Sequence, residues 1–196
     1  MQQNILKHQH KVLGQKLLVN LLKYKKYFRK TSLKQKDIGE QFLNEIASKK
    51  PKSFLEIGVF HGVTARNVCE LLFSIHKSDF KYIGLDLFGE SAENANEVIP
   101  NTKFNNPLKK IYFDYILRKD PYSIGAVADL LKKFEQNVHL IKGNSNKLLK
   151  KIDMSKIDYV FLETRKYIAP IQIHSKNSMD TFAGERSQSR CYELNN

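Results

Sequence analysis

Short apolar runs alternate with amphipathic stretches between residues 37 and 162, and this alternation predicts a sheet covered by helices. Runs rich in β-branched and aromatic residues predict strands at residues 53–59, 81–87, 137–141 and 157–162. Apolar residues that recur every three to four positions predict helices over residues 37–50, 64–75 and 124–134. Strands that alternate with helices of this length are joined by crossover connections. The predicted fold class is therefore α/β, a Rossmann-like, mostly parallel sheet with helices on both faces.

A basic segment, residues 1–36, precedes this pattern. Apolar residues recur there at helical spacing among many lysines, which predicts a basic amphipathic helix; they are Leu13, Leu17, Leu21 and Phe28. Residues 1–50 carry 12 Lys+Arg against 3 Asp+Glu, so most of the net charge of +13 lies ahead of the first strand. Such an arm could contact an anionic membrane surface or, as a less favoured partner, nucleic acid. The favoured interpretation is that its apolar side covers the domain while its lysines stay in water.

Composition is typical of a soluble globular domain. The chain has 196 residues, of which 41% are hydrophobic and 27% charged, enough to bury a sizeable core. No apolar run reaches the ~18 residues that suggest a membrane span, and the first residues lack a secretory hydrophobic region. We therefore expect a cytoplasmic protein without a transmembrane segment. Cys69 and Cys191 have no metal-binding or disulfide spacing, so free thiols and no metal site are expected.

The stretch FLEIGVFHGVTA, residues 54–65, passes from a buried strand through a turn into a helix. In a parallel sheet such a turn lies at the carboxyl edge, where ligands of open α/β sheets bind. Gly58 and Gly62 allow close approach of the backbone to a ligand because neither has a Cβ atom. Thr64 is placed to cap the helix. Glu56 is a carboxylate within an apolar strand, so it requires a cationic or hydrogen-bonding partner.

The spacing E-x-G-x-x-x-G at Glu56, Gly58 and Gly62 resembles motif I of the class I S-adenosylmethionine-dependent methyltransferases. The whole phrase is similar to the small-molecule branch related to macrocin O-methyltransferases, the methyltransferase domain 24 type. It differs from the dinucleotide fingerprint G-x-G-x-x-G. The next strand, KYIGLD, ends in Asp86, which resembles the acid that accepts ribose hydroxyls in this family. The resemblance covers about residues 38–163.

This resemblance implies S-adenosylmethionine as the cofactor, held at the carboxyl ends of the strands. The turn would receive its methionine end with Glu56 shaping the loop, and Asp86 would hold the ribose. The cofactor-binding residues that follow are Glu56, Gly58, Val59, Phe60, Gly62, Asp86, Asn144, Ser145 and Glu163. Two alternatives stay open, because Asp86 could simply end a strand and Asn144–Ser145, expected beside the adenine, could be an ordinary turn with a helix cap.

The resemblance does not supply a general base. Relatives commonly place an acid and a histidine in a phrase like D-G-x-H after the fourth strand, whereas this chain has Glu163-Thr164-Arg165-Lys166. His61 could act as a base, although a histidine after a strand is more often a solvated turn residue. The catalytic residues are therefore unassigned. The predicted function is methylation of a small molecule, such as a sugar or glycan-linked hydroxyl; the alternative is a degenerate domain that binds the cofactor or a partner without turnover.

Two segments fit the predicted fold less well. Residues 164–196 form a short, polar and weakly periodic segment, so the C-terminal strands of the sheet are predicted to be incomplete. This tail is either an irregular cover on the sheet edge or the product of an altered coding frame. Residues 88–123 are long for a connection, and their aromatic residues could line an acceptor pocket or pack as a helix on the core; they are Phe104, Tyr112, Phe113 and Tyr115. The predicted division is an arm at 1–36, an α/β domain at 37–163 and a tail at 164–196.

Overall fold

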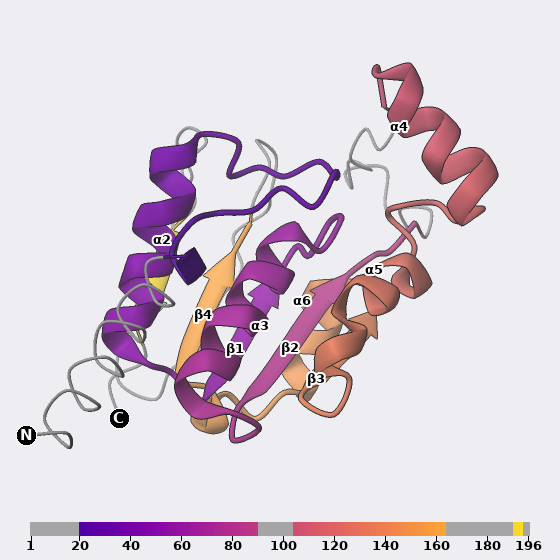
Figure 1. Cartoon of the computed structure of the whole chain (residues 1–196). Coiled ribbons are helices and arrows are strands. Elements are labelled where there is room, and N and C mark those ends of the chain that lie inside the picture. The colour runs from indigo at the N-terminus through magenta and orange to yellow at the C-terminus, as the bar shows by residue number, and fades with distance from the viewer. Residues whose placement is uncertain (1–19, 90–103, 164–189, 194–196) are drawn as a thin grey trace, which may run out of the picture.

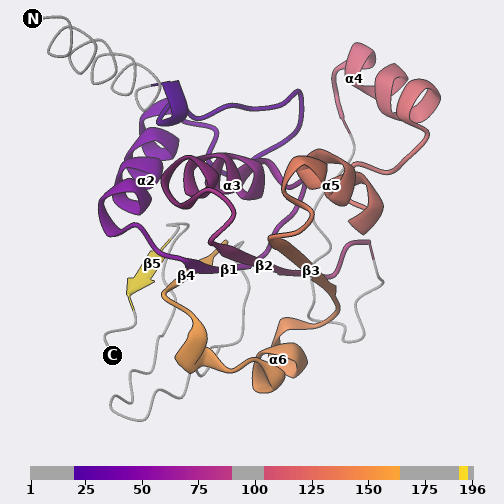
Figure 2. The ribbon, with the colours of Figure 1, turned by 60° about the horizontal axis from the view of Figure 1, so that its bottom comes forward.

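The computed structural model describes residues 20–89, 104–163 and 190–193. Within these residues one sheet has the strand order β3-β2-β1-β4-β5; β1 to β4 are labelled in Figure 1, and β5 is labelled in Figure 2. The parallel strands are β1 (Ser53–Ile57), β2 (Lys81–Asp86), β3 (Val138–Lys142) and β4 (Tyr159–Leu162). β5 (Arg190–Glu193) pairs antiparallel with β4. The prediction of a Rossmann-like α/β fold is confirmed.

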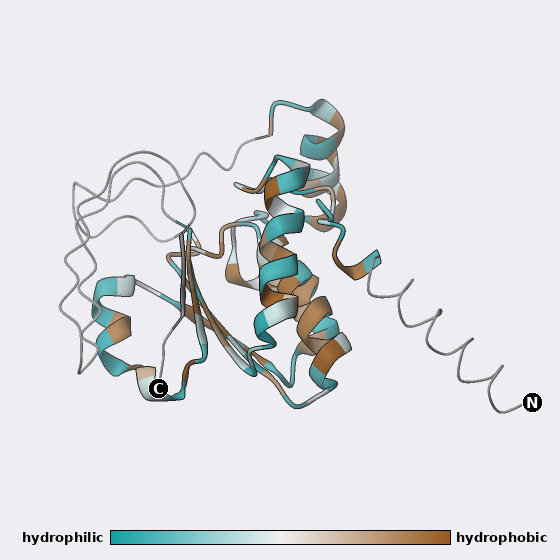
Figure 3. Ribbon diagram, turned by 90° about the vertical axis from the view of Figure 1, so that its left-hand side faces the viewer, coloured by the Kyte–Doolittle hydropathy of each residue, from teal (hydrophilic) through white to brown (hydrophobic). Residues whose placement is uncertain are grey.

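Helices cover both faces of the sheet. One face carries α2 (Lys36–Lys49), α3 (Val63–His76) and α5 (Ile124–Leu131), which continues as a 3₁₀ turn, Lys132–Phe134. The other carries α6 (Ser145–Leu148) with the 3₁₀ turns Leu149–Lys151 and Met154–Lys156 (Figure 2). In Figure 3 the helices of the first layer carry both hydrophobic and hydrophilic positions, as expected of amphipathic helices. The sheet is thus the middle of three layers.

Alternating residues of the parallel strands fill two cores, because a strand sends successive side chains to opposite faces. Phe54 of β1 faces the α2 and α3 layer, where its ring stacks between Tyr82 and Tyr159 at centroid distances of 6.0 and 5.1 Å. Leu55 and Ile57 face the α6 layer instead. Burial on both faces fixes the register of β1, and the register places the turn that follows it at the carboxyl edge of the sheet.

The strand order reverses at β1. The chain adds β2 and β3 on one side of β1 and then returns to its other side as β4. Just beyond the paired residues, the N–H of Glu163 donates to the carbonyl of Ile57 (2.9 Å), and the N–H of Gly58 donates to the carbonyl of Leu85 (2.9 Å). Open α/β sheets bind ligands in the crevice outside the carboxyl ends of the strands at such a reversal.

The arm segment, residues 20–35 before α2, differs from the predicted basic helix. Leu13 and Leu17 lie outside the described residues, and between residues 20 and 35 only residues 20 and 21 are helical. Tyr27 and Phe28 have φ angles of 45° and 57°, which a right-handed helix excludes. A single amphipathic helix reaching Phe28 is therefore wrong for the part of the arm that the structure describes.

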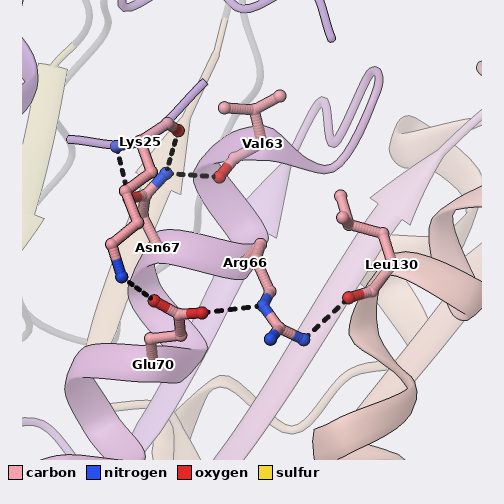
Figure 4. Close-up of polar contacts among 6 residues, drawn as sticks. All are labelled: Lys25, Val63, Arg66, Asn67, Glu70 and Leu130. Carbon is pink, nitrogen blue, oxygen red and sulfur yellow. Dashed lines mark hydrogen bonds and ion pairs between the residues drawn. The ribbon is translucent and has the colours of Figure 1, made fainter. Parts of the chain in front are cut away.

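This segment is instead tied to α3 by polar contacts (Figure 4). The backbone of Lys25 donates to and accepts from the Asn67 side chain, at 2.9 and 2.8 Å. The Lys25 ammonium lies 2.7 Å from Glu70, which also accepts from Arg66 at 3.0 Å, and Arg66 reaches the carbonyl of Leu130 at 2.8 Å. Since Leu130 belongs to α5, the network joins the arm segment, α3 and α5 in one layer.

Two other expectations need correction. Residues 190–193 form β5, so the description of the tail as irregular is wrong there; the remainder of residues 164–196 lies outside the described residues. The long connection, residues 88–123, contains α4 (Pro107–Ile111), which is followed by a π-helix, Tyr112–Leu117. These two helices stand out from the helix layer (Figure 1). Of their aromatic residues Phe113 is buried, whereas Tyr115 is 73% exposed, so most of this helical segment does not pack on the core.

Candidate functional site

The turn between β1 and α3 is built from left-handed backbone. Gly58, Phe60 and Gly62 have φ angles of 91°, 52° and 73°. Gly62 is the N-cap of α3 and has no side chain with which to cap it. Thr64, predicted as the cap, instead shares a hydrogen bond of 2.7 Å with the Tyr24 hydroxyl, so that prediction is wrong. The first turn of α3 therefore keeps its backbone N–H groups free of a side-chain cap.

The two glycines of this turn are required by packing within the protein. A Cβ atom added to Gly58 would lie 2.7 Å from the backbone oxygen of Glu163, at the end of β4. A Cβ atom added to Gly62 would lie 2.8 Å from Cγ1 of Val127, in α5. Real Cβ contacts are essentially never this short, so neither position accepts alanine without movement of its neighbour. Both glycines thus bring the turn against β4 and α5, a reason that the spacing alone did not indicate.

Asp86, at the end of β2, faces this turn. The N–H of Phe60 donates to Oδ2 of Asp86 at 2.6 Å, and the Tyr122 hydroxyl donates to Oδ1 at 2.5 Å. A third, longer contact of 3.4 Å comes from the N–H of Phe88. A carboxylate has about four acceptor positions, so the partly exposed Asp86 can still accept from a further hydroxyl. The structure thus brings the acid and the glycine turn together.

Tyr122 was not found by sequence reasoning. It lies in the turn Asp120–Ser123 before α5, where Asp120 accepts from the N–H of Tyr122 at 2.9 Å. Burial, followed by the charge of Asp86, raises the pKa of Tyr122, so its hydroxyl stays protonated and acts as a donor. The residues DPYS indicate a turn with a helix cap. Nothing in that pattern reveals that the tyrosine reaches the end of β2.

Glu56 lies in the core rather than at the surface of the turn. Its side chain is 0% exposed, and its Oε2 accepts from the Tyr82 hydroxyl at 2.5 Å, which supplies the expected hydrogen-bonding partner. Among the described residues its Oε1 has no hydrogen-bond partner. Burial raises the pKa of Glu56 well above the usual value, and the charges of Glu163 and Asp86 add to this. The protonated acid is therefore favoured.

His61 is enclosed by the arm segment and by aromatic rings. It is 0% exposed, so a solvated turn histidine is the wrong interpretation. Its ring stacks on Phe60 at a centroid distance of 4.0 Å, and its Nδ1 accepts from the N–H of Lys30 at 3.2 Å. Because Nδ1 is an acceptor, the neutral ring carries its proton on Nε2, an assignment made from this hydrogen bond. The histidine thus lies between the turn and the arm segment.

The remaining predicted residues divide into two groups. The backbone of Glu163 adjoins Gly58, as described above, whereas the Val59 side chain belongs to the core. Asn144 accepts from the N–H of Asn146 at 2.9 Å and caps α6, which begins at Ser145. The neighbouring Gly143 donates its N–H to the backbone oxygen of Asp86 at 2.9 Å, so this turn adjoins the end of β2. The part of Asn144 and Ser145 in ligand binding stays a prediction.

Comparison with known proteins agrees with this geometry. A family model described as a methyltransferase domain matches residues 55–176, which include residues 55–57 of β1, the glycine turn and β4. The chain belongs to the methyltransferase-domain family. The resemblance stated from Glu56, Gly58 and Gly62 is thereby confirmed at the level of the family.

Among solved structures, this methyltransferase domain is similar to the methyltransferase PaMTH1 of Podospora anserina, in a crystal structure bound to SAH. The match has 15% sequence identity and a TM-score of 0.42, and it covers 74% of this chain and 61% of that chain. The methyltransferase domain thus spans less than two thirds of the length of that protein. A search of the curated proteins found no match.

The described residues contain neither a membrane-spanning helix nor a metal-binding cluster. None of the helices in residues 20–89, 104–163 and 190–193 is long and apolar enough to cross a membrane. Within the same residues, no group of three or more His, Cys, Asp or Glu side chains could hold a metal ion. Cys69 is buried and free, as predicted.

Proposed function

We propose that this methyltransferase domain binds S-adenosylmethionine at the carboxyl ends of β1, β2 and β4 and methylates a small-molecule acceptor. The observation that carries the proposal is the hydrogen bond of 2.6 Å from the Phe60 N–H to the Asp86 carboxylate. It unites the glycine turn after β1 and an acid from the neighbouring strand at the reversal of strand order, where such sheets bind nucleotides.

The residues present fit this cofactor. Asp86 would accept a ribose hydroxyl, since a carboxylate forms stronger hydrogen bonds with hydroxyl groups than a neutral side chain does. Phe60 and Tyr122 hold that carboxylate in place through the donors described above. The backbone from Gly58 to Gly62 would face the methionine end, with Val59 and Phe60 contributing main-chain groups and Glu163 closing the far side. Glu56, protonated and bonded to Tyr82, would support the turn from within the core.

When bound, S-adenosylmethionine supplies an electrophilic methyl group on its sulfonium. The protein then has to hold the acceptor in line with that group at near-attack distance and exclude water, and positioning of this kind accounts for much of the catalysis. His61 lies within the turn, and its Nδ1 accepts from the N–H of Lys30 at 3.2 Å. Its partners fix the ring, but no base is assigned.

A second candidate function is binding without turnover. It is favoured by the sequence Glu163-Thr164-Arg165-Lys166, which stands where relatives have an acid and a histidine. In this case the glycine turn and Asp86 would bind the cofactor, and the domain would act by presenting the bound form to a partner. The two candidates share the cofactor site and differ in methyl transfer.

Isothermal titration of the full chain with S-adenosylhomocysteine, with NADH as the control ligand, tests the shared site. We expect micromolar binding of S-adenosylhomocysteine and none of NADH, because the glycine spacing is that of motif I. Transfer of a labelled methyl group from S-adenosylmethionine to a panel of hydroxylated small molecules then separates the candidates. Transfer supports the enzyme, binding without transfer supports the second candidate, and absence of binding contradicts both.

A further inference from the structure

A basic hollow lies between the arm segment and the start of α4. It has a volume of about 540 Å³, and its cationic side chains are Lys26, Arg29, Lys30, Lys34 and Lys109. No carboxylate is among the described residues that line it; the other lining side chains are hydroxyl, amide and aromatic. Lys109 lies over the ring of Phe104, which also lines the hollow, at 5.5 Å. The composition of the hollow therefore favours an anionic ligand.

Arg29 is the buried member of this set. Its side chain is 6% exposed. Its guanidinium donates to three carbonyl oxygens of the described residues, those of His61 (3.2 Å), Pro121 (3.3 Å) and Ala126 (2.9 Å). Burial lowers the pKa of Arg29, although a guanidinium remains protonated in proteins. The nearby carboxylate of Asp129 lies 2.6 Å from Lys119 instead.

The guanidinium of Arg29 thus forms no ion pair with a described residue. The ammonium groups of Lys26, Lys34 and Lys109 form none with these residues either. A buried cation without a counter-ion is costly, because burial removes its hydration. An anion in the adjoining hollow would offset that cost.

The hollow adjoins the proposed cofactor site through His61. Arg29 donates to the carbonyl of His61, and Lys30 donates its N–H to the ring of the same residue. That ring stacks on Phe60, whose N–H is bonded to Asp86. Two successive residues, Phe60 and His61, therefore link the acid of the cofactor site to the hollow. An acceptor with its anionic group in the hollow would have to extend past the buried His61 to reach the glycine turn.

We infer that the hollow binds a phosphate group of the methyl acceptor, so that the acceptor is a phosphorylated small molecule. The inference rests on the proposed function, because it names the substrate class of that site. Phosphate is favoured over carboxylate since it carries more charge and three acceptor oxygens, which match a guanidinium and several ammonium groups. The aromatic rings beside the lysines give the remainder of the acceptor an apolar surface.

Titration of the full chain with inorganic pyrophosphate, with and without S-adenosylhomocysteine, tests the hollow. Two doubly substituted variants are matched: Lys26→Ala/Lys109→Ala removes two cations of the hollow, and Lys150→Ala/Lys151→Ala removes two exposed lysines beside α6. We expect pyrophosphate to bind the wild type with an affinity that falls with salt. The first variant should bind pyrophosphate about tenfold more weakly than the wild type, and the second should bind it as tightly as the wild type. Equal pyrophosphate affinity in both variants, or no binding by the wild type, overturns the inference.

The same titrations keep this inference distinct from the proposed function. If S-adenosylhomocysteine binds and pyrophosphate does not, the hollow is not an anion site and the cofactor site stands. If pyrophosphate binds with the expected loss in Lys26→Ala/Lys109→Ala but S-adenosylhomocysteine does not bind, the anion site stands without the cofactor. Methyl transfer to sugar phosphates compared with the parent sugars decides the substrate class: preference for the phosphorylated members, inhibited by pyrophosphate, supports it, and equal transfer to both contradicts it.

Discussion

The N–H of Phe60 and the carboxylate of Asp86 meet at 2.6 Å, which joins the turn after β1 to the end of β2. The two residues are 26 positions apart along the chain. Their contact depends on the parallel register of β1 and β2, in which Ile57 pairs with Leu85. The left-handed conformation of Phe60, at a φ of 52°, belongs to the same turn. A substitution that disturbs either residue therefore changes the shape of the proposed cofactor site.

Replacement of Asp86 by alanine should weaken binding of S-adenosylhomocysteine by at least about tenfold, because it removes a charged acceptor of hydroxyl groups. Isothermal titration measures the loss. Asp79→Ala is the matched control, since Asp79 lies just before the same strand, is exposed and is ion-paired with Lys52 at 2.6 Å. Equal affinities of the two variants would show that the end of β2 takes no part in binding.

Tyr122→Phe should weaken the same binding by about two- to tenfold while the fold is retained. The change removes one hydrogen bond to the Asp86 carboxylate, and a hydrogen bond to a charged group contributes about 1.5–3 kcal/mol. The N–H of Phe60 still holds the carboxylate, so only part of this energy is lost from binding. Circular dichroism checks the fold and titration the affinity. Tyr115→Phe is the control, because Tyr115 is 73% exposed. An affinity of Tyr122→Phe equal to that of the control would mean that the hydroxyl does not orient the carboxylate.

Gly58→Ala and Gly89→Ala separate backbone conformation from close packing. Both glycines have positive φ angles, 91° and 83°. A Cβ at Gly58 would meet the oxygen of Glu163 at 2.7 Å, whereas no atom of the described residues lies within 4 Å of a Cβ at Gly89. We expect urea unfolding to show a loss of about 1 kcal/mol for Gly89→Ala and about 3 kcal/mol for Gly58→Ala. Similar losses in both variants would contradict the close approach of the turn to β4.

Glu56→Gln tests the protonation of the buried acid through the pH dependence of stability. The pKa of Glu56 is raised in the folded state, so its contribution to stability is complete below the unfolded pKa of about 4.3 and is lost as pH rises through the folded pKa. Glutamine keeps an acceptor for Tyr82 but does not titrate. The stability of Glu56→Gln relative to the wild type should therefore rise between pH 5 and pH 8, by up to about 1.4 kcal/mol per pH unit. Parallel stability curves for the two proteins would contradict a raised pKa.

The sheet and its main helices could be predicted because their signals are local. The apolar period of residues 64–75 corresponds to α3, Val63–His76, and the run at residues 81–87 corresponds to β2, Lys81–Asp86. Those runs also predicted where the strands end. The strand ends in turn predicted that Asp86 and the glycine turn lie close together. Burial on both faces of a parallel sheet leaves such strands few alternative registers.

The arm segment and the surroundings of the site could not be predicted, because they depend on contacts between distant residues. The apolar spacing of Leu21 and Phe28 indicates a helix, but the Asn67 side chain holds the Lys25 backbone in a non-helical path. Tyr122 reaches Asp86 across 36 positions, and no periodicity carries that information. The cytoplasmic setting and the nature of residues 164–189 stay predictions.

A crystal structure of the full chain with S-adenosylhomocysteine tests the central claim most directly. We expect a ribose hydroxyl within hydrogen-bonding distance of the Asp86 carboxylate and the amino-acid end of the ligand against the backbone between Gly58 and Gly62. A ligand bound elsewhere on the chain, or one that leaves Asp86 without contact, would contradict the proposed cofactor site.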